Sequence, residues 1–553
     1  MYPVQLTNSY FPAQADDEVR DITIGGLLRE TASTFPNEIG LVEIDIDGNT
    51  GRQWTYTQLL IDSEQLACAL ATRFSPGDRV TVWSPNTPEW VIMEYACALA
   101  GIVLVTANPA LQEKELRYLI EQSESVALFL VDAYRGNPMA TIGASACEGL
   151  DAVREITDME NMSAMHYCFN AGAKVDDNAN AVVNADAPLP DVQAGDAAMI
   201  QYTSGTTGFP KGAVLTHRGL VNNARFYATR LQTHQETVWA NIMPMFHTSG
   251  CGMVTLGCLQ AGCKMLIVKL FEPIAISRLI EREKVSTILG VPTMLVALLE
   301  SLEQQPHDVS SVEMFSSGGA TVAPELVRNI KHVFGCGFGT LYGQTETSPV
   351  ITQHFADDSI DDFCNTIGQP LPQTHVSIRS IDSNAVVPLD TVGEICVKAY
   401  CNMIGYNRNP DATAETIDSD GWLHTGDLGT MDKRGYIKIT GRVKDMIIRG
   451  GENMFPAEIE NALLEHPLVT EVAVVGIPDK KWGEVIACFL RTENNQKITA
   501  SELHDHCRQL LSPQKTPTIW CQTETFPMTG SGKIQKYVIR DRYLQGAYQT
   551  LPL

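Results

Sequence analysis

The chain has 553 residues, enough for several domains of about 100 to 200 residues each. Its 40 basic and 65 acidic residues give a formal net charge of −25, which argues against nucleic-acid binding because phosphate backbones are bound by clustered Lys and Arg. The sequence has no run of about 18 apolar residues, so we expect no transmembrane helix.

The first 20 residues lack the basic segment and the apolar core of a signal peptide, so we expect a cytoplasmic protein. The 14 Cys residues are scattered, without the spacing of a disulfide framework or of paired zinc ligands. We expect them to be reduced and mostly buried. Because the surface is acidic, any anionic ligand needs a locally positive pocket.

Strand and helix patterns alternate along most of the chain. Residues 79–83 are predicted to form a strand, and residues 102–106 another. Between them, residues 88–100 have helical periodicity, with Pro88 at the start and Gly101 at the end. Repeated units of this kind predict a mixed α/β fold in which helices cover parallel sheets.

A loop rich in Gly and hydroxyl residues is the strongest local signal. Residues 203–212 read TSGTTGFPKG and lie between apolar segments at 197–202 and 213–215. Backbone N–H and hydroxyl groups of such a loop can surround phosphate oxygens, and Lys211 adds a charge for the outer phosphates. The loop is not a P-loop, because Gly-Lys-Ser/Thr is missing and a strand is expected to follow. By composition alone, a flexible hairpin loop is the alternative.

Three further segments contain candidate site residues. Residues 244–250 read PMFHTSG and contain His247. Without further context, a His at the end of an apolar run is more often a hydrogen-bonded core residue than a functional one. Residues 317–320 read SGGA, and residues 342–346 read YGQTE. The carboxylate of the last segment suits a hard divalent cation, although alone it could be an exposed Glu in a turn.

Two further motifs precede a change in sequence texture. Residues 421–427 read GWLHTGD, and the carboxylate of Asp427 suits two adjacent hydroxyl donors, although Gly-Asp turns are common. Residues 441–445 read GRVKD. Beyond this point, residues 456–464 are predicted to form an amphipathic helix and residues 471–477 a strand, which indicates a small α+β domain.

The last two segments lie in this small domain. Residues 447–453 read IIRGGEN, in which Gly450 and Gly451 permit close backbone approach. Residues 527–534 read PMTGSGKI and contain Lys533. Considered alone, residues 447–453 could be a polar linker between domains, and Lys533 could be a solvent-exposed lysine in a loop.

Together and in this order, the segments resemble the motifs of the adenylate-forming superfamily, which comprises acyl-CoA synthetases, adenylation domains of peptide synthetases and firefly-type luciferases. The resemblance runs from about Trp54 to Lys536. Residues 444–453, KDMIIRGGEN, are especially similar to medium- and long-chain fatty acyl-CoA synthetases.

The resemblance implies a particular domain organisation. Residues 1–441 would form a large domain of helix-covered parallel sheets with a β-rich subdomain, which holds the ATP and acyl sites. Residues 442–553 would form a small mobile α+β domain that carries the catalytic lysine, with a hinge near Lys444.

The resemblance also implies a nucleotide site. Tyr342 would stack on adenine, and Asp427 would accept hydrogen bonds from both ribose hydroxyls. The full set expected to bind ATP or AMP is Thr203, Ser204, Gly205, Thr206, Thr207, Lys211, Gly318, Gly319, Ala320, Tyr342, Gly343, Asp427 and Arg442.

Catalytic roles follow from the same resemblance. Thr345 would contact the α-phosphate, and Glu346 would hold Mg²⁺. Lys533 would bridge the substrate carboxylate and the α-phosphate, where negative charge accumulates in the transition state. His247 would gate the acyl site. Gly450 and Gly451 would line the channel for CoA.

The implied enzyme is an AMP-forming acid–CoA ligase, which makes an acyl adenylate from a carboxylic acid and ATP and then transfers the acyl group to CoA. Mg²⁺ is the expected cofactor, ATP and CoA are co-substrates, and the acid is expected to be a medium- or long-chain fatty acid. An acyl-AMP ligase that loads a carrier protein, and a ligase for aryl or branched acids, are the alternatives. The identity of the acid and a homodimeric state stay open.

Overall fold

The structure is a computed structural model that describes residues 1–160, 189–203, 210–320, 322–450, 452–528 and 534–552. The strands of the described residues form four sheets. Two are large and mostly parallel, one is antiparallel, and one is built from the last strands of the chain, so the predicted mixed α/β class is confirmed.

The seven-stranded sheet has the order β19-β9-β8-β5-β4-β6-β7. The strands from β8 to β7 in this order are parallel, and β9 pairs antiparallel with both β8 and β19. Its strands are β4 (Arg79–Trp83), β5 (Val103–Ala107), β6 (Ala127–Leu130), β7 (Glu155–Asp158), β8 (Ala197–Thr203), β9 (Lys211–Thr216) and β19 (Gly405–Tyr406).

The nine-stranded sheet has the order β16-β15-β14-β13-β12-β10-β11-β2-β3, with a parallel centre and antiparallel edges. Its strands are β2 (Ile39–Ile44), β3 (Thr50–Thr55), β10 (Val238–Asn241), β11 (Lys264–Val268), β12 (Thr287–Leu289), β13 (Met314–Ser317), β14 (Gly337–Gly343), β15 (Val350–Gln353) and β16 (Gln369–Pro370).

Helices cover both faces of these two sheets. Because successive strand residues point to opposite faces, Met265 and Ile267 of β11 join the core shared by both sheets, whereas Leu266 and Val268 join an outer core. The shared core contains side chains of α1 (Ile24–Thr34), α2 (Tyr56–Ala71), α3 (Pro88–Ala100), α7 (His217–Arg230) and α8 (Leu256–Ala261). The outer faces are covered by α4 (Glu113–Ser123) and α5 (Met139–Cys147) on one sheet, and by α9 (Pro273–Glu283), α10 (Pro292–Gln304) and α11 (Pro324–Phe334) on the other.

The predicted βαβ unit is present with nearly the expected bounds. The Thr87 hydroxyl accepts a hydrogen bond from the Trp90 N–H at the start of α3, Pro88 occupies the first turn, and Gly101 ends the helix in the left-handed conformation at φ 68°. The second strand is β5, one residue later than expected, and it pairs parallel with β4.

The antiparallel sheet has the order β1-β17-β18-β20-β21. Its strands are β1 (Tyr10–Phe11), β17 (Thr374–Arg379), β18 (Gly393–Ala399), β20 (Leu423–Met431) and β21 (Ile437–Arg442). The short helix α12 (Ile360–Asn365) lies in the connection between β1 and β17, and α13 (Pro410–Thr416) lies in the connection between β18 and β20.

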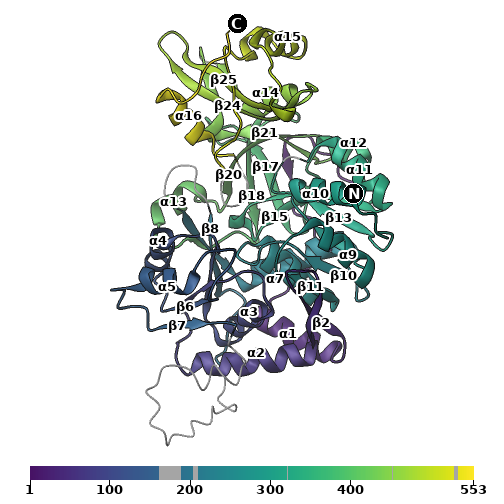
Figure 1. Ribbon diagram of the computed structural model, residues 1–553, viewed down its shortest axis with the longest axis vertical. Helices are drawn as coiled ribbons and strands as arrows, with labels where there is room; N and C mark the ends of the chain where they lie inside the picture. The colour runs from purple at the N-terminus through teal and green to yellow at the C-terminus, as the bar shows by residue number, and fades with distance from the viewer. Residues whose placement is uncertain (161–188, 204–209, 321, 451, 529–533, 553) are drawn as a thin grey trace, which may run out of the picture.

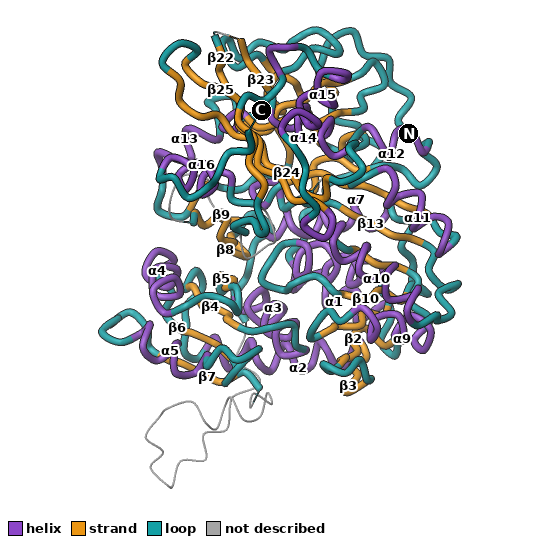
Figure 2. Tube along the Cα trace, turned by 45° about the horizontal axis from the view of Figure 1, so that its top comes forward, coloured by secondary structure: helices purple, strands orange, loops and turns teal. Residues whose placement is uncertain are grey.

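The last strands form a sheet of their own at one end of the molecule, away from α2 and β3 (Figure 1, Figure 2). It consists of β22 (Ile447–Arg449), β23 (Glu452–Met454), β24 (Val469–Asp479), β25 (Gly483–Thr492) and β26 (Ile519–Gln522). It is accompanied by α14 (Pro456–Leu464), α15 (Ala500–Leu510) and α16 (Lys536–Leu544). The bounds of α14 match the predicted helix, and β24 contains the predicted strand.

Among the described residues, no helix is both long and apolar enough to span a membrane. All 13 Cys in the described part of the chain are free thiols, and 12 of them are buried, as expected.

Candidate active site

The hydroxyl-rich loop is anchored by an antiparallel strand pair. Thr203, the last residue of β8, stands opposite Lys211, the first of β9, and the Thr203 hydroxyl donates to the Lys211 carbonyl over 3.3 Å. The loop therefore leaves and re-enters the sheet at one point. Six predicted site residues lie outside the described residues: Ser204, Gly205, Thr206, Thr207, Gly451 and Lys533.

Lys211 and Glu346 share one neighbour, Tyr406. The Lys211 ammonium lies 4.3 Å from the centre of the Tyr406 ring, in cation–π geometry. The Tyr406 hydroxyl donates to Oε1 of Glu346 over 2.6 Å. Burial and the Glu346 charge raise the pKa of Tyr406, so its hydroxyl stays protonated and able to donate. The residue predicted to contact phosphates and the residue predicted to hold Mg²⁺ thus contact the same side chain.

Thr345 and Glu346 lie in a 3₁₀ turn, Thr345–Thr347, directly after β14, and both are buried. The Glu346 carbonyl accepts the Met403 N–H over 2.8 Å, which fixes the turn against the segment before β19. A buried carboxylate with one oxygen bonded to a neutral phenol has the donor chemistry that Mg²⁺ prefers. The residues present therefore fit the predicted metal ligand.

Tyr342, Asp427 and Arg442 form a second cluster. The Tyr342 hydroxyl donates to Oδ2 of Asp427 over 2.8 Å, and Nε of Arg442 lies 2.8 Å from Oδ1. Asp427 and Arg442 stand opposite each other on β20 and β21. The Asp427 charge raises the pKa of Arg442, and burial together with Asp427 raises that of Tyr342. Three predicted nucleotide residues from three strands are thus in contact.

The glycines of the site lie where the backbone is crowded or turned. A Cβ on Gly318 would stand 2.7 Å from the Leu341 carbonyl oxygen, and one on Gly343 would stand 1.8 Å from the Pro349 carbonyl oxygen. Gly319 has φ +77°, and it and Ala320 are exposed after the end of β13. Because side chains are excluded at Gly318 and Gly343, β14 and its neighbours can approach closely.

His247 is exposed and precedes a π-helical turn, Ser249–Thr255. The Ser249 N–H donates to its Nδ1 over 3.2 Å, and the Ser249 hydroxyl lies 3.0 Å from the same atom. Because Nδ1 accepts, the neutral ring carries its proton on Nε2. The gating role of His247 stays a prediction.

The predicted hinge residue lies between two sheets. Lys444 is exposed in a 3₁₀ turn, Val443–Asp445, which follows the end of β21 and precedes β22. Gly450, next to β22, has φ +61°, and its N–H donates to the Trp482 carbonyl over 2.7 Å. A Cβ there would stand 2.9 Å from the Trp482 ring, so this turn favours glycine.

Two family models match the sequence. The AMP-binding enzyme model covers residues 28–407, and the AMP-binding enzyme C-terminal domain model covers residues 458–533. YngI of Bacillus subtilis, which carries the name acyl-CoA synthetase, is 36% identical over 538 residues, which are 95% of this chain and 97% of that protein. This chain belongs to the AMP-binding enzyme family.

Two other relatives agree with this membership. The human mitochondrial medium-chain acyl-CoA ligase ACSF2 is 33% identical over 567 residues, which cover 97% of this chain and 89% of that protein. Among solved structures, ATP-bound MatB from Rhodopseudomonas palustris superposes with a TM-score of 0.82 at 26% identity, over 94% of this chain and 99% of that one.

Sequence reasoning missed Tyr406 in this AMP-binding enzyme. The residue stands in a polar stretch, GYNRNP, that offers no motif. It reaches the site because β19 pairs with β9, which places Tyr406 opposite Ala213 and beside Lys211. The available sequence signal was a short segment with an aromatic residue between turn-forming residues. Such a signal does not indicate which strand the segment pairs with or which side chains Tyr406 contacts.

Proposed function

We propose that this AMP-binding enzyme joins a carboxylic acid to CoA in two steps. In the first, a carboxylate oxygen attacks the α-phosphorus of ATP, the bond to the β-phosphate breaks and pyrophosphate leaves. In the second, the CoA sulfur attacks the acyl carbon, the bond to AMP breaks and the thiol proton is released. The family match and the relatives named as acyl-CoA ligases support this activity.

The proposal rests mainly on the contacts made by residues at the end of β14 and in the turn after it. Tyr342 on this strand bonds Asp427, the residue assigned to the ribose, and four positions later Glu346 bonds Tyr406 beside Lys211. The residues proposed to contact the ribose and the phosphates are thus joined by one short segment, which supports a nucleotide site here. When bound, Mg²⁺ would supply charge neutralisation between phosphate oxygens.

The remaining roles are proposals of the same kind. Lys211 would hold the outer phosphates, and Lys533 would stabilise charge at the α-phosphate in the first step. Residues 1–441 and 442–553 would then rotate about Lys444, which exchanges Lys533 for the Gly450 hairpin. The exposed Lys444 between two separate sheets supports a hinge at this position.

The acid is proposed to be a medium- or long-chain fatty acid, since the relative ACSF2 is named as a medium-chain acyl-CoA ligase. Pyrophosphate release should be measured with acids from acetate to palmitate and with benzoates, with and without CoA. We expect the fastest release with a fatty acid and a thioester product when CoA is present. No thioester with any acid would refute the ligase assignment and favour a carrier-protein acceptor.

The role of Lys533 has its own test. Lys533→Ala should abolish adenylation while it spares thioester formation from supplied acyl adenylate. Equal loss of both steps would contradict the assignment of Lys533 to the first step alone.

A further inference from the structure

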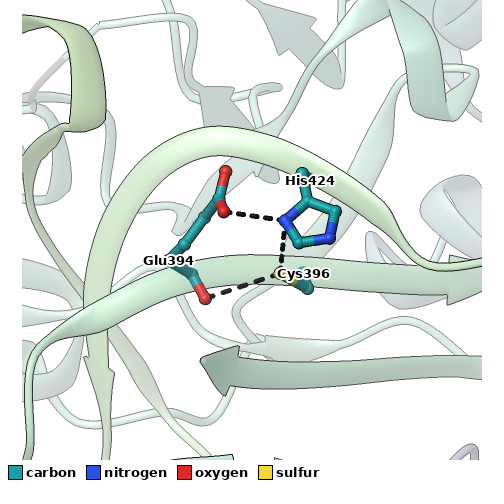
Figure 3. Close-up of side chains that lie close together, drawn as sticks. All are labelled: Glu394, Cys396 and His424. Carbon is teal, nitrogen blue, oxygen red and sulfur yellow. Dashed lines mark hydrogen bonds and ion pairs between the residues drawn. The ribbon is translucent and has the colours of Figure 1, made fainter. Parts of the chain in front are cut away.

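Three side chains from β18 and β20, Glu394, Cys396 and His424, lie close together (Figure 3). His424 on β20 stands opposite Cys396 on β18, and Glu394 lies on the same face of β18. Nδ1 of His424 is 2.7 Å from Oε2 of Glu394 and 3.5 Å from the Cys396 sulfur. The ring of His424 therefore points across the strand pair to an acid.

A second acid faces the other side of the same ring. Oδ2 of Asp418 lies 3.6 Å from Nε2 of His424, and Oδ1 of Asp418 accepts the Trp422 N–H over 2.9 Å. Behind it, Arg379 lies 3.7 Å from Oδ2 of Asp418. Since a carboxylate faces each ring nitrogen, the form of His424 that suits this position has an N–H on both, which is the imidazolium.

The network continues directly into the Asp427 segment. Oε1 of Glu394 accepts the Gly426 N–H over 3.0 Å. The Thr425 hydroxyl donates to the Ile395 carbonyl over 2.7 Å and accepts the Asp427 N–H over 3.1 Å. One oxygen of Glu394 thus holds His424, and the other holds the backbone immediately before Asp427.

We propose that His424, as a cation between Glu394 and Asp418, is a positioning residue that fixes the backbone before Asp427. It thereby helps to place the Asp427 carboxylate, which Tyr342 and Arg442 contact directly, for the ribose hydroxyls. The proposal rests on the proposed nucleotide role of Asp427. Glu394 raises the pKa of His424, in agreement with this geometry. In the described part of the chain, the charged and titratable groups that face His424 are Glu394, Cys396 and Asp418, with Arg379 behind Asp418.

The sign of the pH effect follows from the cation. His424 has a folded pKa above its ordinary 6.5, so its contribution is complete below about pH 6.5 and is lost as the pH rises through the raised value. Recognition of the ribose hydroxyls should therefore weaken in alkaline solution.

Glu394, Cys396 and His424 offer oxygen, sulfur and nitrogen donor atoms, and zinc binds such a set of ligands. Two observations favour the hydrogen-bonded network. Both oxygens of Glu394 are engaged, by His424 and by Gly426. Burial and Glu394 raise the pKa of the Cys396 thiol, whereas a metal needs the thiolate. Zinc is therefore an outcome that the experiment must be able to detect.

The experiment compares AMP with 2′,3′-dideoxy-AMP, which lacks both ribose hydroxyls. The ratio of the two dissociation constants, measured by calorimetry from pH 6 to pH 9, cancels the titration of the phosphate that both ligands share. In the unmodified enzyme we expect the preference for AMP to fall by about tenfold across this range, the value of roughly one charge-assisted hydrogen bond.

Two variants isolate the cation. His424→Arg keeps a positive charge at every pH, so the preference for AMP should persist at pH 9. His424→Gln removes the charge, so the preference should be weak and independent of pH. Circular dichroism of both variants checks that they fold, and the rescue by Arg separates a charge effect from a loss of packing.

Each remaining outcome contradicts a different statement. A strong preference for AMP that is independent of pH in the unmodified enzyme, or that survives in His424→Gln, overturns the role of His424. Equal affinity for the two ligands at every pH instead refutes the ribose role of Asp427 in the proposed function. One equivalent of zinc in the purified enzyme, detected by mass spectrometry and absent from Cys396→Ser, would also overturn the hydrogen-bonded network.

Discussion

Tyr406 offers a test of how Glu346 and Lys211 are held. Tyr406→Phe removes the hydroxyl that donates to Oε1 of Glu346 but keeps the ring that lies 4.3 Å from the Lys211 ammonium. A hydrogen bond to a charged group contributes about 1.5 to 3 kcal/mol, and each 1.4 kcal/mol is tenfold in affinity. We expect Tyr406→Phe to weaken MgATP binding by about 10- to 100-fold.

The two parts of the side chain can be separated by calorimetry with MgATP and with ATP in the presence of a chelator. Tyr406→Phe should weaken MgATP binding and leave metal-free ATP binding nearly unchanged. Tyr406→Leu also removes the ring, and a cation–π contact contributes about 0.5 to 2 kcal/mol, so metal-free ATP should also bind less tightly.

Tyr436→Phe is the matched control. The Tyr436 hydroxyl donates to the carboxylate of Asp358 over 2.5 Å, outside the candidate site. This variant loses the same kind of bond and should keep its MgATP affinity. Unchanged or tighter MgATP binding by Tyr406→Phe would refute the reasoning, because the phenol would then not hold Glu346 in its binding position.

Three further predictions concern the nucleotide, the backbone and pH. Asp427→Asn should weaken AMP binding by about tenfold or more in the same calorimetric assay, since a charged acceptor for the ribose is lost. Gly318→Ala should lower the free energy of unfolding by about 1 to 3 kcal/mol in urea, because its Cβ would stand 2.7 Å from the Leu341 carbonyl oxygen. Burial lowers the pKa of His217 and of His354 to about 4, so between pH 6.5 and pH 4 these residues are protonated in the unfolded chain but not in the folded one. The free energy of unfolding, measured in urea, should therefore fall over this range as the pH is lowered, by up to about 3 kcal/mol for each residue.

The elements predicted best from the sequence are those whose signals are local. The bounds of α3 were predicted from Pro88 in the first turn and Gly101 after the last, and both act within the helix itself; the structure adds the capping hydroxyl of Thr87. The helix at 456–464 was predicted from its amphipathic pattern, which is also a local signal, and the structure places Pro456 in its first turn.

Strand ends were less well predicted, because they depend on a partner. The apolar pattern indicates a strand at 471–477, but β24 spans Val469–Asp479, since its pairing with β25 continues through polar residues to Asp479 and Gly483. The motifs of the candidate site, by contrast, were found as continuous segments, and the structure brings Tyr342, Asp427 and Arg442 into contact.

The side chains that hold these motif residues could not be found in this way. Tyr406 is 60 residues from Glu346 in the sequence, and Glu394 is 30 residues from His424. Each contact exists only because two strands pair, and no local pattern states which strands do so. Sequence motifs therefore predict the residues that contact the ligand, but not the residues that position them.

The residues that hold the site carboxylates have a physical role of their own. A chain with a net charge of −25 that binds a nucleotide cannot leave its site carboxylates unrestrained, because each would repel the phosphates unless it is aimed at a hydroxyl or a cation. Asp427 is held by Tyr342 and Arg442, and Glu346 is held by Tyr406. Changes in nucleotide affinity should therefore arise at partners such as Tyr406 as readily as at the residues assigned to the nucleotide.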